Sequence, residues 1–206
     1  MVDLYDQDQT ETYVGIAGIG SYEIMCNAYG WTNDGQYPPY LSPYSKVEAG
    51  WLTPIEITKP GYYTLMPSEL SSQVYIIKQN FPNMEYLLIE NRYGLKWDGQ
   101  MTGKGLIIYH VDDNAPLQTQ RGYPGHANWP AWHYRVAVLQ ADGRYDIEHG
   151  TNLGDATDFW GQGSVLGPGP NTWPNTDSYQ NGQVKTGITI RVTTAASFIM
   201  QIQVTW

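Results

Sequence analysis

The chain has 206 residues, of which 20 are acidic and 11 are Lys or Arg, so its formal net charge is −9. This excess of acidic residues argues against a nucleic-acid partner, because such proteins need basic clusters to displace the counterions of phosphate groups. The apolar runs are too short to cross a bilayer. The single cysteine, Cys26, excludes an internal disulfide and a cysteine-based zinc site.

The composition favours strands and loops over long helices. The chain contains 22 Gly, 13 Pro, 17 Tyr and 8 Trp, and only 15% of its residues are charged, against about 25% in a typical globular protein. Gly and Pro are poor helix formers, whereas Tyr and Trp are enriched in strands. We therefore predict a mainly β fold: an antiparallel β-sandwich-like domain preceded by a loop-rich segment with one short helix.

That short helix is predicted at residues 43–49. Residues 1–40 show neither the period of a strand nor that of a helix, and they contain many glycines. Ser42 can then cap a helix, Pro43 suits its first position, and Gly50 can end it. Little regular structure is expected before this helix.

Short strands are predicted over most of the remaining chain. They are expected at residues 54–58, 61–66, 74–78, 85–92, 105–111 and 134–141. Segments 85–92 and 105–111 are almost continuously apolar, which is typical of strands that are covered on both faces. Segment 161–171 is rich in Gly and Pro and is predicted to be an irregular loop.

The clearest alternation of apolar and polar residues predicts an antiparallel hairpin at the C-terminus. Gln201 and Gln203 are expected to face away from the core. The residues expected to be buried by this hairpin are Ile188, Ile190, Val192, Phe198, Met200, Ile202 and Val204.

Two groups of side-chain oxygens are candidates for calcium, which prefers several oxygen ligands. The weaker group is Asp3, Asp6 and Asp8, for which a solvated acidic terminus is the alternative. The denser group lies between residues 142 and 158, and its main candidates are Asp142, Asp155 and Asp158. Its spacing is not that of an EF-hand, and an ordinary polar loop is the alternative.

The histidines give weaker signals. His110 and Asp112 lie on one side of the strand end before Asn114, which would suit a metal, but hydrogen bonds to loops are the favoured interpretation. His126 and His133 lie in an aromatic loop and are interpreted as packing residues, because no carboxylate is near them in the sequence.

Strand 85–92 also carries a charged pair. Alternation places Glu90 and Arg92 on one face of the strand. We expect a structural ion pair or hydrogen-bond anchor there rather than a catalytic pair.

Several motifs, in sequence order, resemble the secreted zinc metallopeptidases related to immune inhibitor A. The early motifs are Asp3-Leu4-Tyr5-Asp6, the Gly-rich stretch into Ile24-Met25, Leu41-Ser42-Pro43-Tyr44-Ser45-Lys46 and Gly50-Trp51. The later motifs are EYLLIENR at 85–92, Trp97-Asp98, GKGLIIYHVD at 103–112, VLQADG at 138–143 and NLGDATD at 152–158. Together they cover nearly the whole chain.

The resemblance implies a division into two parts and a set of roles. Residues 1–52 would be the end of a metallopeptidase-like catalytic domain, and residues 53–206 a β-rich, sandwich-like domain. Asp3 would correspond to the third zinc ligand, and Met25 to the methionine turn beneath the metal, close to Asp3. The resemblance further implies peptide-bond hydrolysis in intact relatives, a protein or peptide substrate, and an extracellular location.

One part of the family pattern is missing from the 206 residues. The family's zinc helix carries HExxH, whereas the histidines of this chain are His110, His126, His133 and His149, and none belongs to such a motif. Catalytic zinc needs about three protein ligands and an open position for water. The chain alone is therefore expected to be inactive, and to bind zinc only if an upstream segment or another chain supplies the helix.

Two other classes of function remain open. One is a non-catalytic extracellular β-sandwich module that binds carbohydrate or protein, in which exposed aromatic rings would stack on sugars. The other is a structural subunit with a large apolar face. The acidic first residues predict no signal peptide in this chain, and no membrane partner is expected.

Overall fold

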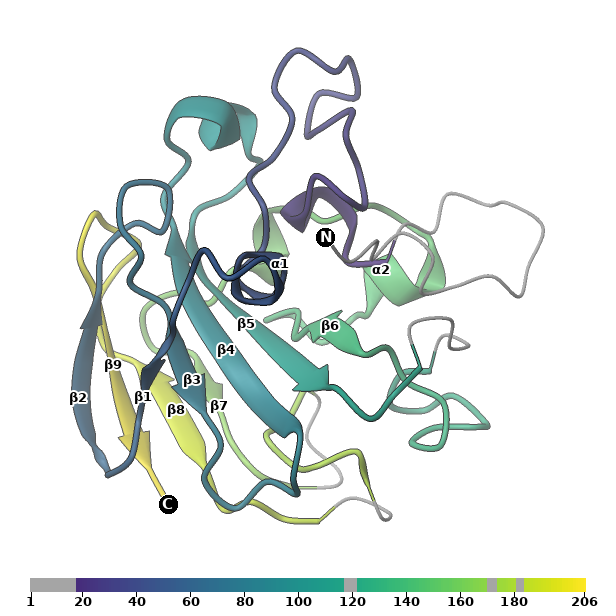
Figure 1. The fold of residues 1–206 in the computed structure, drawn as a ribbon, viewed down its shortest axis with the longest axis vertical. Coiled ribbons are helices and arrows are strands. Elements are labelled where there is room, and N and C mark those ends of the chain that lie inside the picture. The colour runs from purple at the N-terminus through teal and green to yellow at the C-terminus, as the bar shows by residue number, and fades with distance from the viewer. Residues whose placement is uncertain (1–17, 117–121, 170–173, 181–183) are drawn as a thin grey trace.

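The computed structural model describes residues 18–116, 122–169, 174–180 and 184–206. Two packed sheets form most of it (Figure 1), with strand orders β1-β3-β4-β5-β6 and β2-β9-β8-β7. Neighbouring strands are antiparallel, except that β1 and β3 are parallel. The prediction of a mainly β, sandwich-like fold is confirmed.

The five-stranded sheet consists of β1 (Ile55–Glu56), β3 (Tyr75–Ile77), β4 (Glu85–Arg92), β5 (Gly105–Asp112) and β6 (Val136–Val138). The four-stranded sheet consists of β2 (Gly61–Leu65), β9 (Met200–Thr205), β8 (Thr189–Val192) and β7 (Val165–Leu166). Strand β4 has the predicted bounds and β5 is one residue longer than predicted. Strands β1, β2, β3 and β6 are shorter than predicted.

Strands β4 and β5 are buried along their whole length, as their apolar sequences predict. They pair from Glu85 opposite Asp112 to Arg92 opposite Gly105. One face of this pair packs on the four-stranded sheet, where Leu87, Ile108 and Ile202 belong to one hydrophobic cluster. The opposite face is covered as well, so the molecule has a third layer.

The third layer is built from the segment before β1. The second hydrophobic cluster includes Tyr22 and Tyr44 from this segment, together with Leu88 and Tyr109 from the sheet. Figure 1 shows α1 (Pro43–Glu48) in front of the five-stranded sheet, and α1 contacts β4. This packing joins residues on both sides of the suggested boundary at residue 52. The division of the chain into two parts stays a prediction.

Helix α1 forms for the reasons given by its sequence. The Ser42 hydroxyl accepts a hydrogen bond from Ser45 N at 3.3 Å, Pro43 begins the helix, and Gly50 adopts a positive φ of 70° beyond its end. The predicted helix at 43–49 is thereby confirmed. No helix in the described ranges is long and apolar enough to span a membrane.

A second helix, α2 (Asp146–His149), was not predicted. It has only four residues, which is too few to show a helical period, and Gly150 ends it with a positive φ of 69°. Short 3-10 turns include η2 (Gly20–Tyr22), η3 (Lys96–Gln100) and η4 (Ala156–Asp158).

The C-terminal hairpin forms as predicted, with one error in burial. Val192 pairs with Ile202, and every predicted core residue except Phe198 is buried. Phe198 is 41% exposed because β9 begins at Met200, so that Phe198 lies in the preceding loop. Its ring instead makes an edge contact with Tyr93 at 6.1 Å between centroids.

The prediction that segment 161–171 is wholly irregular is wrong. It contains β7, in which Leu166 pairs with Ile190 and is fully buried. Two residues between Gly-rich flanks give no alternation to detect, so the strand depends on its tertiary partner.

Candidate functional site

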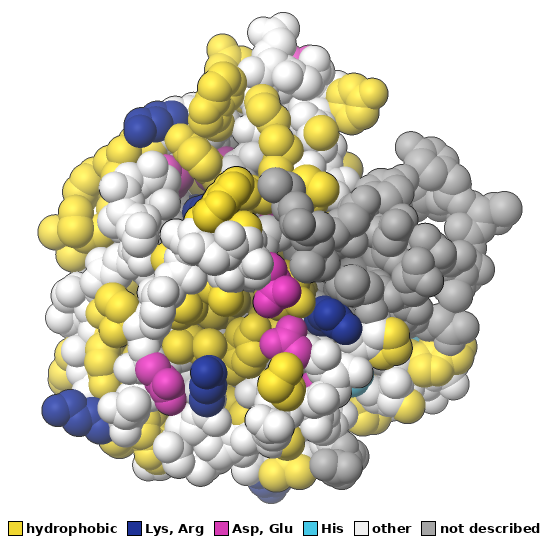
Figure 2. All heavy atoms as spheres, viewed as in Figure 1, with side chains coloured by type: hydrophobic (Ala, Val, Ile, Leu, Met, Phe, Trp, Pro, Cys, Tyr) yellow, Lys and Arg dark blue, Asp and Glu magenta, His cyan; other side chains and the backbone are white. Residues whose placement is uncertain are grey.

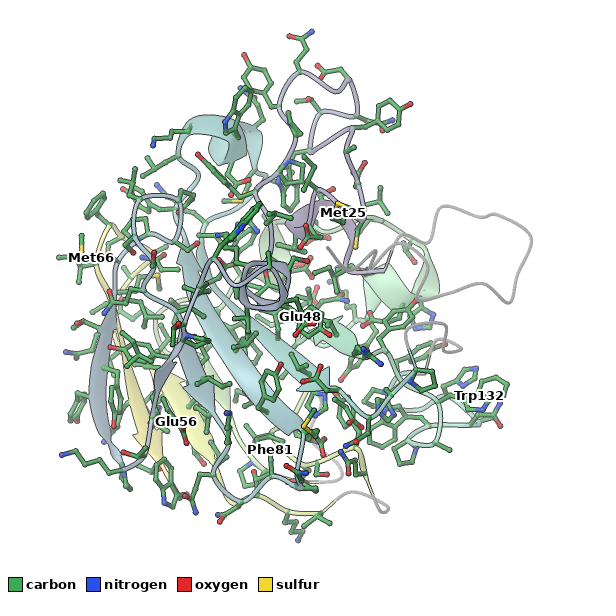
Figure 3. All side chains as sticks on the ribbon, viewed as in Figure 1. Met25, Glu48, Glu56, Met66, Phe81 and Trp132 are labelled. Atoms are coloured by element: carbon green, nitrogen blue, oxygen red, sulfur yellow. The ribbon has the colours of Figure 1, made fainter. Side chains whose placement is uncertain are left out.

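Met25 lies in a tight turn, as predicted. The backbone N–H groups of Cys26 and Asn27 both donate to the carbonyl of Glu23, at 3.0 and 2.9 Å. The buried Glu23 carboxylate accepts hydrogen bonds from the backbone N–H of Met25 and of Ser42, at 3.2 and 2.7 Å. The methionine turn is thus tied to the start of α1, and Figure 3 marks its position.

The predicted partner of this turn, Asp3, lies outside the described residues, as do Asp6 and Asp8. The closeness of Met25 to Asp3 and the weaker calcium site therefore stay predictions.

A buried arginine connects the sheet to this turn. Arg92, at the end of β4, is 1% exposed and donates from Nε to Asp98 Oδ2 at 2.9 Å. Its Nη1 donates to the carbonyl oxygen of Tyr22 at 2.8 Å and lies 3.5 Å from Glu90 Oε1. The predicted anchor role of Glu90 and Arg92 is confirmed.

Arg92 keeps its charge in this network in spite of its burial. Burial alone would lower the pKa of Arg92, but the carboxylates of Asp98 and Glu90 outweigh it and raise that pKa well above its ordinary value. Tyr109 donates to Glu90 Oε1 at 2.7 Å, and burial, followed by the charge of Glu90, raises the pKa of its hydroxyl. These groups are too deeply buried to meet a substrate, so their role is to position the turn.

The three main calcium candidates do come together. Asp142, Asp155 and Asp158 each place a carboxylate oxygen within 4.8 Å of those of the other two. Asp142 follows β6. Asp158 is the last residue of η4 and Asp155 is its N-cap, and the two form a capping box. Among the described residues this is the one group of three or more acidic, His or Cys side chains with such spacing.

Few hydrogen-bond donors and positive charges on side chains lie close to Asp142 and Asp155. The hydroxyl of Thr157 lies 2.6 Å from both Asp142 Oδ2 and Asp155 Oδ1, although it has only one hydrogen to donate. Arg144 Nε lies 3.5 Å from Asp142, but the arginine side chain is 67% exposed and its charge is screened.

The electrostatics of the trio reflect this crowding. Burial raises the pKa of Asp158 to about 6, and the charges of Asp155 and Asp142 add to the effect. The Thr157 hydroxyl, by contrast, lowers the pKa of Asp155. Clustered oxygen ligands with unbalanced negative charge are the chemistry that hard cations favour.

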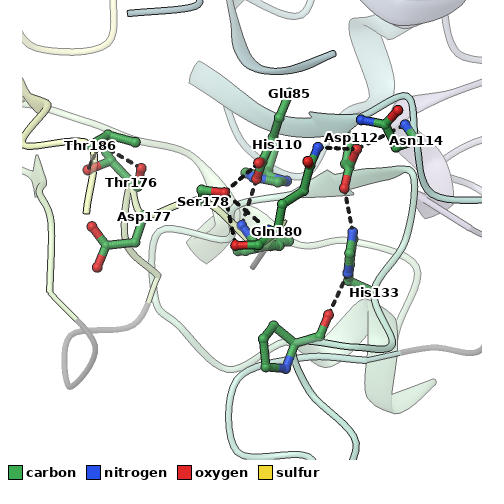
Figure 4. Close-up of polar contacts among 12 residues, drawn as sticks. Glu85, His110, Asp112, Asn114, His133, Thr176, Asp177, Ser178, Gln180 and Thr186 are labelled. Atoms are coloured by element: carbon green, nitrogen blue, oxygen red, sulfur yellow. Dashed lines mark hydrogen bonds and ion pairs between the residues drawn. The ribbon is translucent and has the colours of Figure 1, made fainter. Parts of the chain in front are cut away.

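The polar cluster at the end of β5 belongs to a hydrogen-bond network rather than to a metal site (Figure 4). His110 Nε2 lies 2.8 Å from Glu85 Oε1, and the hydroxyl of Ser178 donates to the other oxygen of Glu85. Burial lowers the pKa of His110. The favoured interpretation, hydrogen bonds to loops, is confirmed.

His133 packs against Tyr179 as interpreted, with 5.3 Å between the ring centroids, but it also makes polar contacts that were not predicted. Its Nε2 lies 3.0 Å from Asp112 Oδ2, and its Nδ1 lies 2.7 Å from the carbonyl oxygen of Pro130 (Figure 4). Gln180 and the backbone N–H of Asn114 also donate to Asp112. Burial would raise the pKa of Asp112, but the hydrogen bonds with His133 and Asn114 outweigh it and lower that pKa. The pairing was not apparent from the sequence because it joins residues 21 positions apart.

A groove of about 640 Å³ lies beside the methionine turn and was not predicted. It is lined by Ile24, Met25, Pro38, Pro39, Tyr40, Leu41, Lys46, Trp51 and Trp97. These residues come from separate stretches between positions 24 and 97, so no single stretch of sequence predicts the groove. Hydrophobic side chains gather over η3 and the segment before α1 in Figure 2.

A second hollow, of about 600 Å³, lies between α1 and β3. Glu48, Glu56 and Phe81 are on its wall, as Figure 3 shows. Its carboxylate Asp113 accepts hydrogen bonds from the hydroxyls of Tyr44 and Tyr86, both at 3.1 Å, and so has a structural role.

No protein-family model, curated protein or solved structure matches this chain.

Proposed function

We propose that this chain is the portion of an immune-inhibitor-A-like, secreted zinc metallopeptidase that follows the HExxH helix. Its role would be structural: it forms the floor and one wall of the substrate cleft and is inactive by itself. The observation that carries the proposal is the hydrogen bond from Arg92 to Tyr22, three positions before Met25. It links the EYLLIENR motif to the methionine turn.

The network around this bond supports the same role. Asp98, from the Trp97-Asp98 motif, pairs with Arg92 and also accepts from the backbone N–H of Tyr40 at 3.3 Å. Tyr109, from the GKGLIIYHVD motif, donates to Glu90. Polar residues from three of the resembling motifs thus meet in one buried cluster that fixes the segment before α1.

The described residues do not fit catalytic zinc. Their one group with ligand spacing is the acidic trio of Asp142, Asp155 and Asp158, which contains no histidine. His110 and His133 are engaged with Glu85 and Asp112. Hydrolysis by this chain alone is therefore not part of the proposal.

We further propose that the acidic trio binds calcium and stabilises the fold. Asp158 is 1% exposed, and the hydroxyl of Tyr22 donates to its Oδ2 at 2.9 Å. A cation at the trio would offset the repulsion among its carboxylates. It would also secure the contact between η4 and the segment that carries the methionine turn.

The proposal of a peptidase portion is tested by the coding sequence immediately upstream of Met1. We expect it to encode HExxHxxG in frame, shortly before Asp3. A casein-cleavage assay on the purified 206-residue chain, with and without zinc, should give no activity. Zinc-restored cleavage would overturn the inactivity, and an upstream sequence without the motif would overturn the assignment.

The calcium proposal is tested by thermal melts in EDTA, calcium or magnesium. A ligand that binds only the folded state stabilises it by about 2.7 kcal/mol at a hundredfold excess over Kd. Asp155→Ala should abolish the calcium-dependent rise in Tm, whereas Asp3→Ala should leave most of it. An unchanged Tm of the wild-type chain across millimolar calcium would contradict the proposal.

A further inference from the structure

The groove beside Met25 has the properties of a ligand site. Its volume of about 640 Å³ lies within the range of small-molecule pockets, about 300–1,000 Å³. Apolar side chains make up most of its wall, including Ile24, Leu41 and the two prolines of Pro38-Pro39. Such a wall favours a ligand with a substantial apolar part.

Two large aromatic rings on this wall are left open to solvent. Trp51 is 65% exposed and Trp97 is 52% exposed. In the described part of the chain neither ring stacks on another aromatic ring, in contrast to Trp31, which packs against Tyr22. Exposed apolar area that is concentrated in a concave site marks a binding surface more often than scattered exposure does.

The groove also has one charged side chain, Lys46 of α1. Its ammonium lies 5.9 Å from the centroid of the Tyr40 ring and forms no ion pair with any described carboxylate. In a chain with a net charge of −9, Lys46 is the one charged side chain among the lining residues of this groove. It complements an anionic group at one end of an apolar ligand.

We propose that this groove binds an apolar chain that ends in a carboxylate, with the chain against Trp51 and Trp97 and the carboxylate at Lys46. A fatty acid and the C-terminal apolar residue of a peptide share this chemistry. A neutral sugar fits less well, because its many hydroxyl groups would meet few hydrogen-bonding partners on this wall. The inference depends on neither the peptidase proposal nor the calcium proposal.

Isothermal titration of the full chain with decanoate, below its micelle concentration, tests the proposal. We expect one site, with affinity rising about fourfold for each methylene from octanoate to decanoate, as about 0.8 kcal/mol per buried CH₂ implies. 1-Decanol should bind about tenfold more weakly, because it lacks the charge that pairs with Lys46. A peptide ending in Leu-Phe, compared with its amide, distinguishes a peptide source from a lipid source.

Matched variants separate the two parts of the site. Lys46→Met should reduce the affinity for decanoate to that for 1-decanol and leave the affinity for 1-decanol unchanged. The control is Lys104→Met, which removes a lysine that lies over the Tyr93 ring and does not line the groove. It should change neither affinity. Trp97→Ala should weaken both ligands at least tenfold. Trp132→Ala, on the distant loop before β6, should have no effect.

Several results would overturn the proposal. They are no binding of either carboxylate probe, equal affinity for decanoate and 1-decanol, or full decanoate binding by Lys46→Met. Displacement of decanoate by a neutral oligosaccharide would also overturn it, in favour of a sugar site.

Discussion

Arg92 is the residue on which the arrangement of charges in this molecule depends most. It neutralises Asp98 and lies beside Glu90, and all three side chains are at most 1% exposed. Removing one partner of a buried ion pair is costly, because the remaining charge has neither water nor a counterion.

We therefore expect Arg92→Met to lower the free energy of unfolding by about 3–5 kcal/mol. Urea denaturation measures the change. The control is Arg191→Met, which removes an exposed arginine from β8 and should cost less than about 0.5 kcal/mol. Equal costs for the two variants would contradict the anchor role.

Glu148, on α2, should make stability depend on pH. Burial raises the pKa of Glu148 to about 8 from an ordinary value of 4.5, and the nearby charge of Asp158 adds to the shift. Between these values the folded state keeps a proton that the unfolded state releases. Raising the pH therefore favours unfolding, by up to about 1.4 kcal/mol per pH unit.

In EDTA, we expect the free energy of unfolding to fall from pH 5 to pH 8. For Glu148→Gln it should fall less steeply over the same range. The glutamine retains an acceptor for Gln140 Nε2, which now donates to Glu148 at 2.7 Å. Urea unfolding at several pH values measures both slopes. Parallel profiles for the two proteins would show that Glu148 is not the titrating group.

Among the single elements, we expect even the two-residue strand β7 to contribute to the stability of the fold. Leu166 is fully buried in the core between the sheets, whereas its neighbour Val165 is 43% exposed. Leu166→Ala should lower the free energy of unfolding by about 2–5 kcal/mol, and Val165→Ala by less than about 0.5 kcal/mol. Chemical denaturation measures both losses. Similar losses for Leu166→Ala and Val165→Ala would mean that β7 does not contribute to the core between the sheets.

The elements differ in how far their sequences reveal them. Strands β4 and β5 could be predicted because eight consecutive residues fit between two apolar layers, and α1 because Ser42 and Pro43 are local signals. Strand β7 and helix α2 could not, because they are too short to show a period and exist through tertiary contacts. The contact between His133 and Asp112 could not be predicted either, because it too depends on tertiary structure.

The candidate sites divide in a similar way. The acidic trio could be predicted because oxygen-bearing side chains are dense between residues 142 and 158. Asp155 and Asp158 are close in sequence, whereas Asp142 lies before α2 and reaches them through the fold. The groove at Trp97 could not be predicted, because its wall comes from distant segments whose packing no local pattern specifies. Lys46 and Trp51 belong to motifs that resemble one peptidase family, but of the residues in the groove the resemblance assigns a role only to Met25.

For the whole molecule, the layered arrangement predicts an order of local stability. The amides of β4 and β5 lie in the middle layer, whereas β1 and β2 are edge strands. In native-state hydrogen exchange we expect β4 and β5 to exchange only through global unfolding, and the edge strands to exchange sooner. Faster exchange in β5 than in β2 would contradict a sheet that is covered on both faces.

The covered outer face of this sheet has a practical consequence for producing shorter versions of the protein. A fragment that began at Thr53 would lack Tyr22 and Tyr44, and would leave Leu88 and Tyr109 facing water. A contiguous apolar sheet surface of this kind promotes aggregation. We expect such a fragment to accumulate as insoluble material on expression, and the full 206-residue chain to remain in the soluble fraction.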